Sequence, residues 1–353
     1  MKTEIACFIS PHGFGHATRT IAILEALQAV KPDLLFHLIT TVPQTLFQST
    51  SLYYRYHPVP VDVGLLQKDS FSFDIPGTVK ALGRFIPFAA RELERLKKIC
   101  KSSILVLSDI SIVGIHVAKM CSIPAVLVEN FTWDWIYAQV KQAPELQTFV
   151  PVFKELYAQA NFRIQAEPAC LRIPCDLRCQ PISRRLRSVA DDLRQTLNSG
   201  NRKIVLVTTG GISTELPFID LLADYQDYYF ILAGHKEDIQ RGSNISALAH
   251  STQLYHPDLI NIADLVICKS GYSTIAECCQ SRASVACVHR GEFPESAVLE
   301  HFVRRNLAGA VYDQQQFFSG QWLGDLPQLL GRRAGPYPIN GAEEAAAFIA
   351  SLF

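Results

Sequence analysis

Hydrophobic runs and helical repeats alternate along the first half of the chain. Short apolar runs predict strands at residues 5–10, 34–40, 54–61, 103–109 and 124–130. Between them, apolar side chains recur at helical spacing, which predicts helices at residues 17–30, 84–100 and 112–120. Strands that are apolar throughout and alternate with helices are typical of a parallel sheet covered on both faces.

The same alternation starts again in the second half, with strands predicted at residues 203–211, 228–234, 263–271 and 283–290. Residues 166–200 carry no strong strand signal and are rich in Pro, Arg and Cys. We therefore expect an α/β protein with two facing Rossmann-like, doubly wound parallel-sheet domains, at residues 1–165 and 201–335, joined by a linker at 166–200. A ligand cleft is expected between the domains, at the carboxyl ends of the strands. The pattern at residues 340–353 predicts a capped, alanine-rich amphipathic helix.

Composition narrows the class of protein. The 353 residues carry 33 Lys and Arg against 33 Asp and Glu, so the balanced charge excludes a general nucleic-acid binder. Ten irregularly spaced cysteines indicate reduced thiols in a cytoplasmic protein, and Cys170, Cys175 and Cys179 are expected to be free thiols because no fourth zinc ligand is evident. The N-terminus does not resemble a signal peptide, and no apolar run reaches membrane-spanning length. Peripheral contact with a membrane stays open.

The loop SPHGFGHATRT, residues 10–20, follows the first strand and opens a helix. A dinucleotide fingerprint fits it poorly, because the third glycine is replaced by Thr18. A P-loop fits worse, since no Gly-Lys-Ser/Thr follows. Two interpretations stay open: the histidines satisfy the helix end, or the loop performs chemistry.

The chemical interpretation makes His16 a general base. The positive end of a helix favours a neutral imidazole, which accepts protons near neutral pH. Gly13 and Gly15 allow a substrate hydroxyl to approach the backbone closely. Asp109 ends a buried strand and is expected to orient His16 and stabilise its imidazolium form. The alternative for Asp109 is an N-cap on the helix at residues 112–120.

The stretch CKSGYSTIAECC, residues 268–279, combines a strand end, a Ser-Gly-Tyr-Ser turn and a helix start near Thr274. Backbone N–H groups at such a turn form an anion site, and Glu277 is positioned to bind ribose hydroxyls. The alternative is a capping box formed by Thr274 and Glu277. A second strand–glycine–helix turn at residues 208–214 suggests that the two turns together hold a nucleotide diphosphate.

The segment ADLVICKSGYSTIAECCQSRASVACVH resembles the donor-binding segment of glycosyltransferases with the GT-B fold, and is similar to the peptidoglycan GlcNAc transferase family. Together with HGFGHATR and VDVGLLQKD, it more closely resembles the glycosyltransferase-like half of plant L-arabinokinases and their bacterial relatives. This resemblance implies that His16 is the catalytic base, that Asp109 pairs with it, and that the helix within residues 336–353 returns to the first domain.

Two sets of contacts are expected, and the resemblance itself implies the donor contacts at Ser270, Gly271, Thr274 and Glu277. Donor contacts are expected at Gly210, Gly211, Lys269, Ser270, Gly271, Ser273, Thr274, Glu277, Arg290 and Glu295, with Glu292 as an alternative to Glu295. Acceptor contacts are expected at His12, Gly13, Gly15, Arg19, Gln67, Asp69 and Asn130. Arg290 either neutralises phosphate or is an ordinary surface arginine. The peptidoglycan enzymes end their second motif in a Gln-rich turn, whereas this chain reads HRGEFPES there.

These patterns predict an inverting, metal-independent glycosyltransferase of hexosyl or N-acetylhexosaminyl type. The donor is expected to be a nucleotide sugar, with UDP favoured, and no further cofactor is expected. An acceptor hydroxyl, activated by His16, displaces the nucleotide, and backbone amides with Lys269 or Arg290 stabilise the leaving charge. The alternatives are a non-catalytic nucleotide-sugar binding protein and a nucleotide-sugar 2-epimerase. A monomer or weak dimer is expected.

Overall fold

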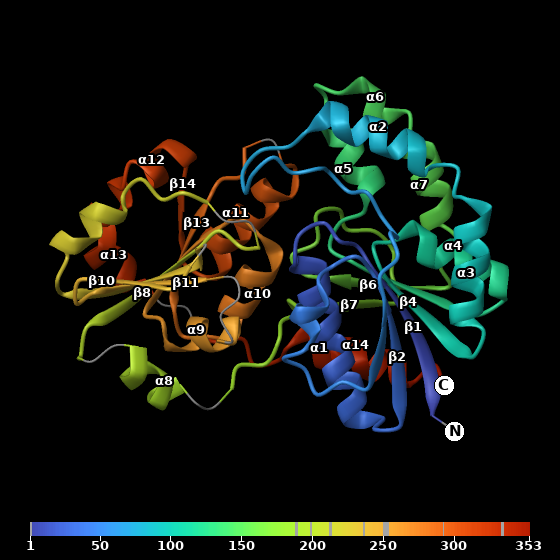
Figure 1. Ribbon diagram of the computed structural model, residues 1–353, viewed down its shortest axis with the longest axis horizontal. Helices are drawn as coiled ribbons and strands as arrows, with labels where there is room; N and C mark the ends of the chain where they lie inside the picture. The colour runs from blue at the N-terminus through green and yellow to red at the C-terminus, as the bar shows by residue number, and fades with distance from the viewer. Residues whose placement is uncertain are drawn as a thin grey trace. The chain divides into compact units, whose positions relative to one another are not determined.

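The chain folds into two compact units, each built on one sheet (Figure 1). A computed structural model describes residues 2–187, 190–197, 200–211, 214–235, 237–249, 254–291, 293–332 and 335–353. Unit 1 comprises the chain up to Leu66 together with Phe73–Ser183 and Ile339–Phe353. Unit 2 comprises Gln67–Ser72 and Arg184–Pro338.

Within the described residues, unit 1 contains a seven-stranded sheet in the order β3-β2-β1-β4-β5-β6-β7, and all neighbouring strands are parallel. Its inner strands are buried along most of their length, as the apolar runs predicted. The strands are β1 (Thr3–Ile9), β2 (Leu34–Ile39), β3 (Tyr54–His57), β4 (Ser103–Asp109), β5 (Ala125–Glu129), β6 (Phe162–Ala166) and β7 (Leu177–Cys179).

Helices cover both faces of this sheet (Figure 1). Helix α4 packs closely on β1 because Gly114 has no side chain: a Cβ there would lie 2.8 Å from Cβ of Phe8. Helix α14 lies beside α1 and is capped by Asn340, which accepts from the N–H of Ala342. The helices are α1 (Gly15–Val30), η1 (Gln44–Phe47), α2 (Ile75–Phe85), α3 (Ala90–Cys100), α4 (Ile112–Cys121), α5 (Trp133–Gln139), α6 (Pro144–Gln147), α7 (Val150–Tyr157) and α14 (Gly341–Ala350).

Unit 2 repeats this architecture. Its described strands form a seven-stranded sheet in the order β10-β11-β9-β8-β12-β13-β14, and only the edge strand β10 runs antiparallel to its neighbour. The strands are β8 (Lys203–Thr208), β9 (Tyr228–His235), β10 (Ile239–Arg241), β11 (Ile245–Ala249), β12 (Leu265–Lys269), β13 (Ser284–Val288) and β14 (Ala310–Tyr312).

The core of unit 2 is rich in aromatic side chains, including Phe218, Phe230 and Trp322. Helices α9, α10 and α11 contact one another in sequence, and α13 packs on β13. The helices are α8 (Ala190–Leu197), η2 (Ile219–Asp224), α9 (His256–Ile262), α10 (Tyr272–Cys279), α11 (Glu295–Asn306), α12 (Gln314–Phe318), η3 (Gln321–Asp325) and α13 (Leu326–Leu330). None of the described helices is long and apolar enough to cross a membrane.

The structure corrects three predictions from the sequence. The single helix expected at residues 84–100 is divided into the end of α2 and all of α3, because Pro87 has no N–H to donate and interrupts the helical hydrogen bonding. The linker expected at 166–200 belongs to unit 1 as far as Ser183, since β7 pairs with β6. The segment Gln67–Ser72, expected in the N-terminal domain, belongs to unit 2.

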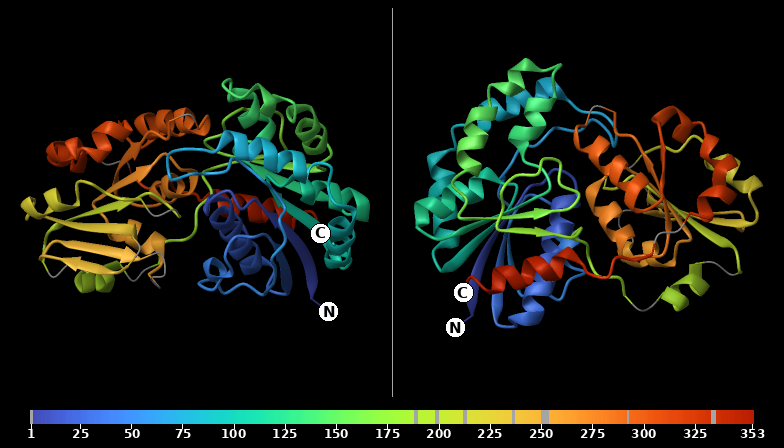
Figure 2. Two further views of the ribbon diagram at one scale, coloured as in Figure 1. Left: turned by 45° about the horizontal axis from the view of Figure 1, so that its top comes forward. Right: turned by 180° about the vertical axis from the view of Figure 1, so that it is seen from behind.

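The C-terminal segment is split between the units. Residues 336–338 belong to unit 2, and Ile339–Phe353 belong to unit 1, where α14 contacts α1 and β7. The C-terminus and the first strand accordingly lie in the same unit (Figure 2).

Candidate active site

The candidate base and its orienting carboxylate meet at the carboxyl end of the unit 1 sheet. His16 is the second residue of α1, and Asp109 is the last residue of β4. His16 Nδ1 lies 2.8 Å from Asp109 Oδ1, and both side chains are buried. When Nδ1 carries the proton it donates to Asp109, which leaves Nε2 as the basic nitrogen.

Arg19 also binds Asp109, on the same helix face as His16. Its Nε donates to Oδ2 at 2.8 Å and its Nη2 to Oδ1 at 2.6 Å, so the guanidinium and carboxylate form a two-bond pair. Arg19 Nη1 donates to Asn130 Oδ1 at 2.5 Å, and Thr20 Oγ1 lies 3.3 Å from Asp109 Oδ2. Arg19 is 2% exposed and Asn130 1%. Both side chains are buried in the network that holds Asp109, and the contact of Arg19 and Asn130 with an acceptor stays a prediction.

Electrostatics keep Asp109 ionised. Burial alone would raise its pKa, but the Arg19 guanidinium and then His16 outweigh burial and hold the pKa below its ordinary value. The structure also removes the capping alternative for Asp109. Ser111, not Asp109, caps α4, and no side chain caps α1 at its N-cap residue, Phe14.

Aromatic side chains surround His16, which is only 6% exposed. The Phe131 ring meets the imidazole edge-on at 5.6 Å, and the Trp133 ring lies 6.5 Å away. His12 packs edge-on against Trp133 at 5.0 Å. Gly13 has a φ of +69° and no atom within 4 Å of the position a Cβ would take, so glycine suits the backbone of this turn.

Sequence reasoning missed Asp62, a second buried carboxyl group of this site. Trp133 Nε1 donates to Asp62 Oδ2 at 2.5 Å, and the N–H of Val63 donates to Oδ1 at 2.9 Å. Burial raises the pKa of Asp62 to about 6, although hydrogen bonds and the nearby His16 oppose this rise. The signal was present in the sequence VDVG, where one carboxylate interrupts an apolar run.

In unit 2, two cations lie at the carboxyl ends of β12 and β13. Burial, and then the proximity of Arg290, lower the pKa of Lys269 to about 7, while Asp69 and Glu295 oppose the fall. Burial lowers the pKa of Arg290 to about 10, against the charge of Glu295. Arg290 is 5% exposed, so it is not an ordinary surface arginine. The turn after β8 approaches Lys269 closely: a Cβ on Gly210, whose φ is +81°, would lie 3.0 Å from Lys269 Cε.

Glu277 is fully enclosed by partners. Arg184 Nε and Nη2 both lie 2.8 Å from Oε1, and His256 Nδ1 lies 2.9 Å from Oε2. Burial would raise the pKa of Glu277, but Arg184 and His256 hold it below its ordinary value. The capping-box alternative is wrong, because the N-cap of α10 is Gly271 and it has no side-chain cap. Ribose binding at Glu277, which is 1% exposed, therefore requires its present partners to move.

The remaining predicted donor residues divide into two groups. Ser270 is fully buried, and its Oγ lies 2.9 Å from the carbonyl of Val288 and 3.0 Å from Glu300 Oε1; its contact with a donor stays a prediction. Partly exposed positions follow the strand ends or begin α10, and these are Gly211, Gly271, Ser273 and Thr274. Glu295 is buried in the first turn of α11, and Glu292 lies outside the described residues.

Gln67 and Asp69, which were predicted as acceptor contacts, belong to unit 2. The charge of Asp69 acts on Lys269. These two residues therefore belong to the same unit as the candidate donor residues, and their contact with an acceptor stays a prediction.

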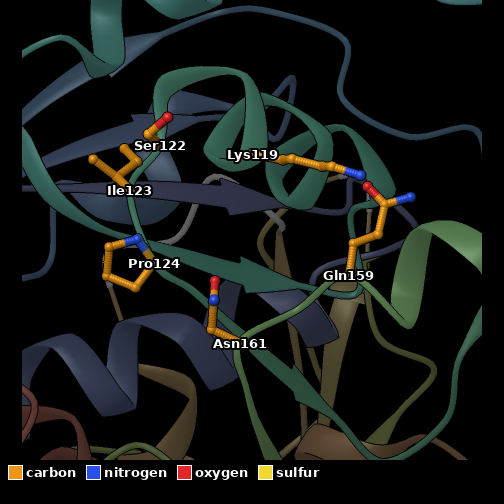
Figure 3. A pocket seen from close by; sticks show the side chains of 6 residues that line it. All are labelled: Lys119, Ser122, Ile123, Pro124, Gln159 and Asn161. Carbon is orange, nitrogen blue, oxygen red and sulfur yellow. The ribbon is translucent and has the colours of Figure 1, made fainter.

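A hollow of about 520 Å³ lies at the amino ends of the strands of the unit 1 sheet (Figure 3). It is lined by residues at the end of α4 and at the amino ends of β5 and β6, namely Lys119, Ser122, Ile123, Pro124, Gln159 and Asn161. His16 and Asp109 stand at the other end of the strands, so this hollow is separate from the candidate active site. Among the residues that the structure describes, no cluster of three or more His, Cys, Asp or Glu side chains is arranged to hold a metal ion.

Comparison with known proteins supports the predicted fold. No family model matches the chain. It is 26% identical to an L-arabinokinase of Arabidopsis thaliana over 97% of its own length, and it spans about a third of that relative, 33%. The structure of MurG from Acinetobacter baumannii matches 99% of this chain and 100% of its own, with 13% identity and a TM-score of 0.57. A Streptomyces sp. SF2575 glycosyltransferase, SsfS6, complexed with thymidine diphosphate, matches 99% of each chain, with 14% identity and a TM-score of 0.57.

These likenesses extend over both units. The chain therefore has the GT-B fold, and its predicted resemblance to GT-B glycosyltransferases and to plant L-arabinokinases is confirmed.

Proposed function

We propose that the chain is a glycosyltransferase that moves a sugar from a nucleoside diphosphate donor to an acceptor hydroxyl. The observation that carries this proposal is the 2.8 Å contact between His16 and Asp109 at the carboxyl ends of β1 and β4. In a GT-B fold, a neutral imidazole held in one tautomer by a carboxylate is suited to accept the proton of a hydroxyl.

The proposed reaction is a direct displacement. The acceptor O–H gives its proton to His16 Nε2 while its oxygen bonds to the anomeric carbon. The bond from that carbon to the donor phosphate breaks, and its electron pair leaves with the nucleoside diphosphate. With one base and no covalent intermediate, the anomeric configuration inverts. Lys269, Arg290 and the N-terminus of α10 are the groups proposed to stabilise the leaving charge, in a reaction that uses no metal ion.

The donor is proposed to be a UDP-sugar, with a hexosyl or N-acetylhexosaminyl group. Burial lowers the pKa of both Lys269 and Arg290, and the charge of Arg290 lowers that of Lys269 further, so a diphosphate would favour the charged form of Lys269. The thymidine diphosphate bound to SsfS6 makes TDP the natural competitor of UDP in any test of base preference.

One observation favours a second candidate function, nucleotide-sugar binding without transfer. Arg19 makes two bonds to Asp109, and its Nη2 lies 3.2 Å from His16 Nδ1. A guanidinium in this position cancels much of the carboxylate field that would stabilise an imidazolium ion. The Asp109 pair would then serve stability more than catalysis.

Turnover measurements separate the two candidates. The purified chain is incubated with UDP- and TDP-sugars, with and without a mixture of hydroxyl acceptors, and release of nucleoside diphosphate is followed. Release of nucleoside diphosphate that depends on the added acceptors, and that His16→Ala abolishes, supports transfer. Binding of UDP or TDP without release, unaffected by His16→Ala, supports the non-catalytic candidate.

A further inference from the structure

A hairpin-like loop between β3 and α2 changes units twice (Figure 1). Its stem residues Leu66 and Phe73 belong to unit 1, and Asp74 N–H donates to the Leu66 carbonyl at 2.7 Å. Its tip, Gln67–Ser72, belongs to unit 2 and is closed by a bond from Lys68 N–H to the Ser72 carbonyl at 3.1 Å. The sequence signalled no reason for these six residues to leave the first domain.

Phe71 anchors the tip. Its side chain is 6% exposed and belongs to the core of unit 2. The Phe318 ring meets it edge-on at 5.4 Å, and the Phe317 ring lies 6.3 Å away. Burial of this large apolar side chain among aromatic rings attaches the tip to the core of unit 2.

Ser70 ties the tip to the turn that follows β8. It is fully buried, its Oγ donates to the Thr209 carbonyl at 3.3 Å, and the hydroxyl of Thr214 donates to Ser70 Oγ at 2.9 Å. Thr209 directly precedes Gly210, whose backbone lies against the Lys269 side chain. Ser70 therefore holds the backbone on which Lys269 rests.

Asp69 adds a charge at the same place. Its Oδ1 accepts from the N–H groups of Phe71 and Ser72 at 2.7 and 2.9 Å, and the Ser72 hydroxyl donates to Oδ2 at 2.6 Å. These bonds fix the carboxylate where its charge acts on Lys269. The other charged or titratable groups that act on Lys269 are Arg290, Glu295 and Cys268.

We propose that the tip, Gln67–Ser72, is a built-in part of the nucleoside diphosphate site of unit 2, with Ser70 and Asp69 as positioning residues for the turn at Thr209–Gly211 and for Lys269. The inference rests on the proposed function and deepens it. A segment from the first fifth of the chain then sets the affinity of a site whose other residues lie beyond residue 208.

The test uses the full chain and calorimetric titration with UDP and with TDP between pH 6.5 and 8.5. Ser70→Ala removes the bond to the Thr209 carbonyl and is expected to weaken binding about fivefold, the effect of one buried hydrogen bond. Asp69→Asn keeps an oxygen that accepts the turn bonds and removes the charge. It is expected to move the pH at which affinity falls to lower values, because less negative charge then supports protonated Lys269. Lys80→Gln, at an exposed position of α2 outside the tip, is the control and is expected to bind as the wild type does.

Hydrogen–deuterium exchange gives a readout that does not need a ligand. In Ser70→Ala, amide exchange at Gly210 and Gly211 is expected to accelerate, while exchange in β13 stays unchanged. If Ser70→Ala and Asp69→Asn both bind UDP with wild-type affinity and pH profile, the inference is overturned. If the wild type binds neither UDP nor TDP, the proposed donor is wrong. The exchange rates then decide the role of the tip, since unchanged rates at Gly210 and Gly211 also overturn it.

Discussion

The two units place charged residues at the same edge of the same kind of sheet, yet they balance charge differently. In unit 1, the Asp109 carboxylate is bound by Arg19 and contacted by His16, so its pKa stays below the ordinary value. In unit 2, burial lowers the pKa values of Lys269 and Arg290, and the charge of Arg290 lowers that of Lys269 further. In unit 1 an arginine and a histidine hold one carboxylate, whereas in unit 2 two cations lie near the carboxylates of Asp69 and Glu295, which only partly oppose the fall in the pKa of Lys269.

The difference indicates a division of labour. A satisfied network fixes the position of one imidazole without attracting ions, whereas buried cations with lowered pKa values gain stability when an anion arrives. Glu277 in unit 2 has the same kind of partners as Asp109 in unit 1, because an arginine and a histidine contact its carboxylate. If this comparison is right, substitutions in the two units will separate turnover from nucleotide affinity.

The largest effect is expected from His16→Ala. Loss of a general base lowers turnover by about 10²–10⁴-fold. UDP affinity stays at the wild-type value, because the proposed donor residues belong to unit 2. Turnover per folded molecule is measured beside a UDP titration. Wild-type turnover in the variant would show that His16 has only a structural role.

Asp109→Asn is expected to destabilise the fold. The amide leaves Arg19, 2% exposed, without the carboxylate that compensates its charge. Removing one partner of a buried ion pair lowers the free energy of unfolding by about 3–5 kcal/mol. Urea unfolding of the variant measures this loss. Glu94→Gln, which breaks an exposed pair with Lys97 on α3, is the control and should change stability little. Equal stability of the two variants would contradict the assignment.

The elements around the sites could be predicted where a local pattern decides them. The strand at residues 103–109 is β4 with the same bounds, because an apolar run in a parallel sheet ends where its first charged residue appears. The contact between His16 and Asp109 followed from two strand ends that meet at one edge. Element positions in the second half were also close, as for β12 and β13.

Partners far apart in the sequence could not be predicted. Arg19 reaches Asp109 across 90 positions, and Arg184 reaches Glu277 across 93, and no local signal marks either pair. The tip at Gln67–Ser72 was missed for a similar reason: its assignment to unit 2 depends on the burial of Phe71 in a core formed by residues more than a hundred positions later. Tertiary packing decides such placements, and periodicity carries no information about them.

Glu277→Gln tests whether this carboxylate binds ribose. A charged hydrogen bond to a hydroxyl contributes about 1.5–3 kcal/mol, so UDP affinity is expected to fall roughly ten- to hundredfold. Gln keeps an oxygen for Arg184 but removes the charge that compensates it, so UDP affinity is measured per folded molecule. Asp264→Asn is the matched control, since Asp264 pairs with Arg194 at the amino end of β12. If both variants bind UDP as the wild type does, Glu277 is a purely structural partner of Arg184.

The smallest effect is expected in the pH dependence of UDP binding, which tests whether Lys269, beside Arg290, meets the diphosphate. Lys269 has a pKa of about 7 in the free protein, and a bound diphosphate favours its charged form. Affinity is therefore constant where Lys269 is protonated in both states and falls above pH 7, by up to about tenfold per pH unit.

The stability of the free protein has the opposite slope. Because the folded-state pKa lies below the ordinary value of 10.5, the unfolded chain binds more protons between about pH 7 and 10.5, and stability rises with pH in that window. Lys269→Met should remove both slopes, and Lys203→Met, at a half-exposed lysine of β8, should keep them. A wild-type affinity that stays level from pH 7 to 8.5 would mean that Lys269 does not meet the diphosphate, and the two edges would then differ in charge without differing in function.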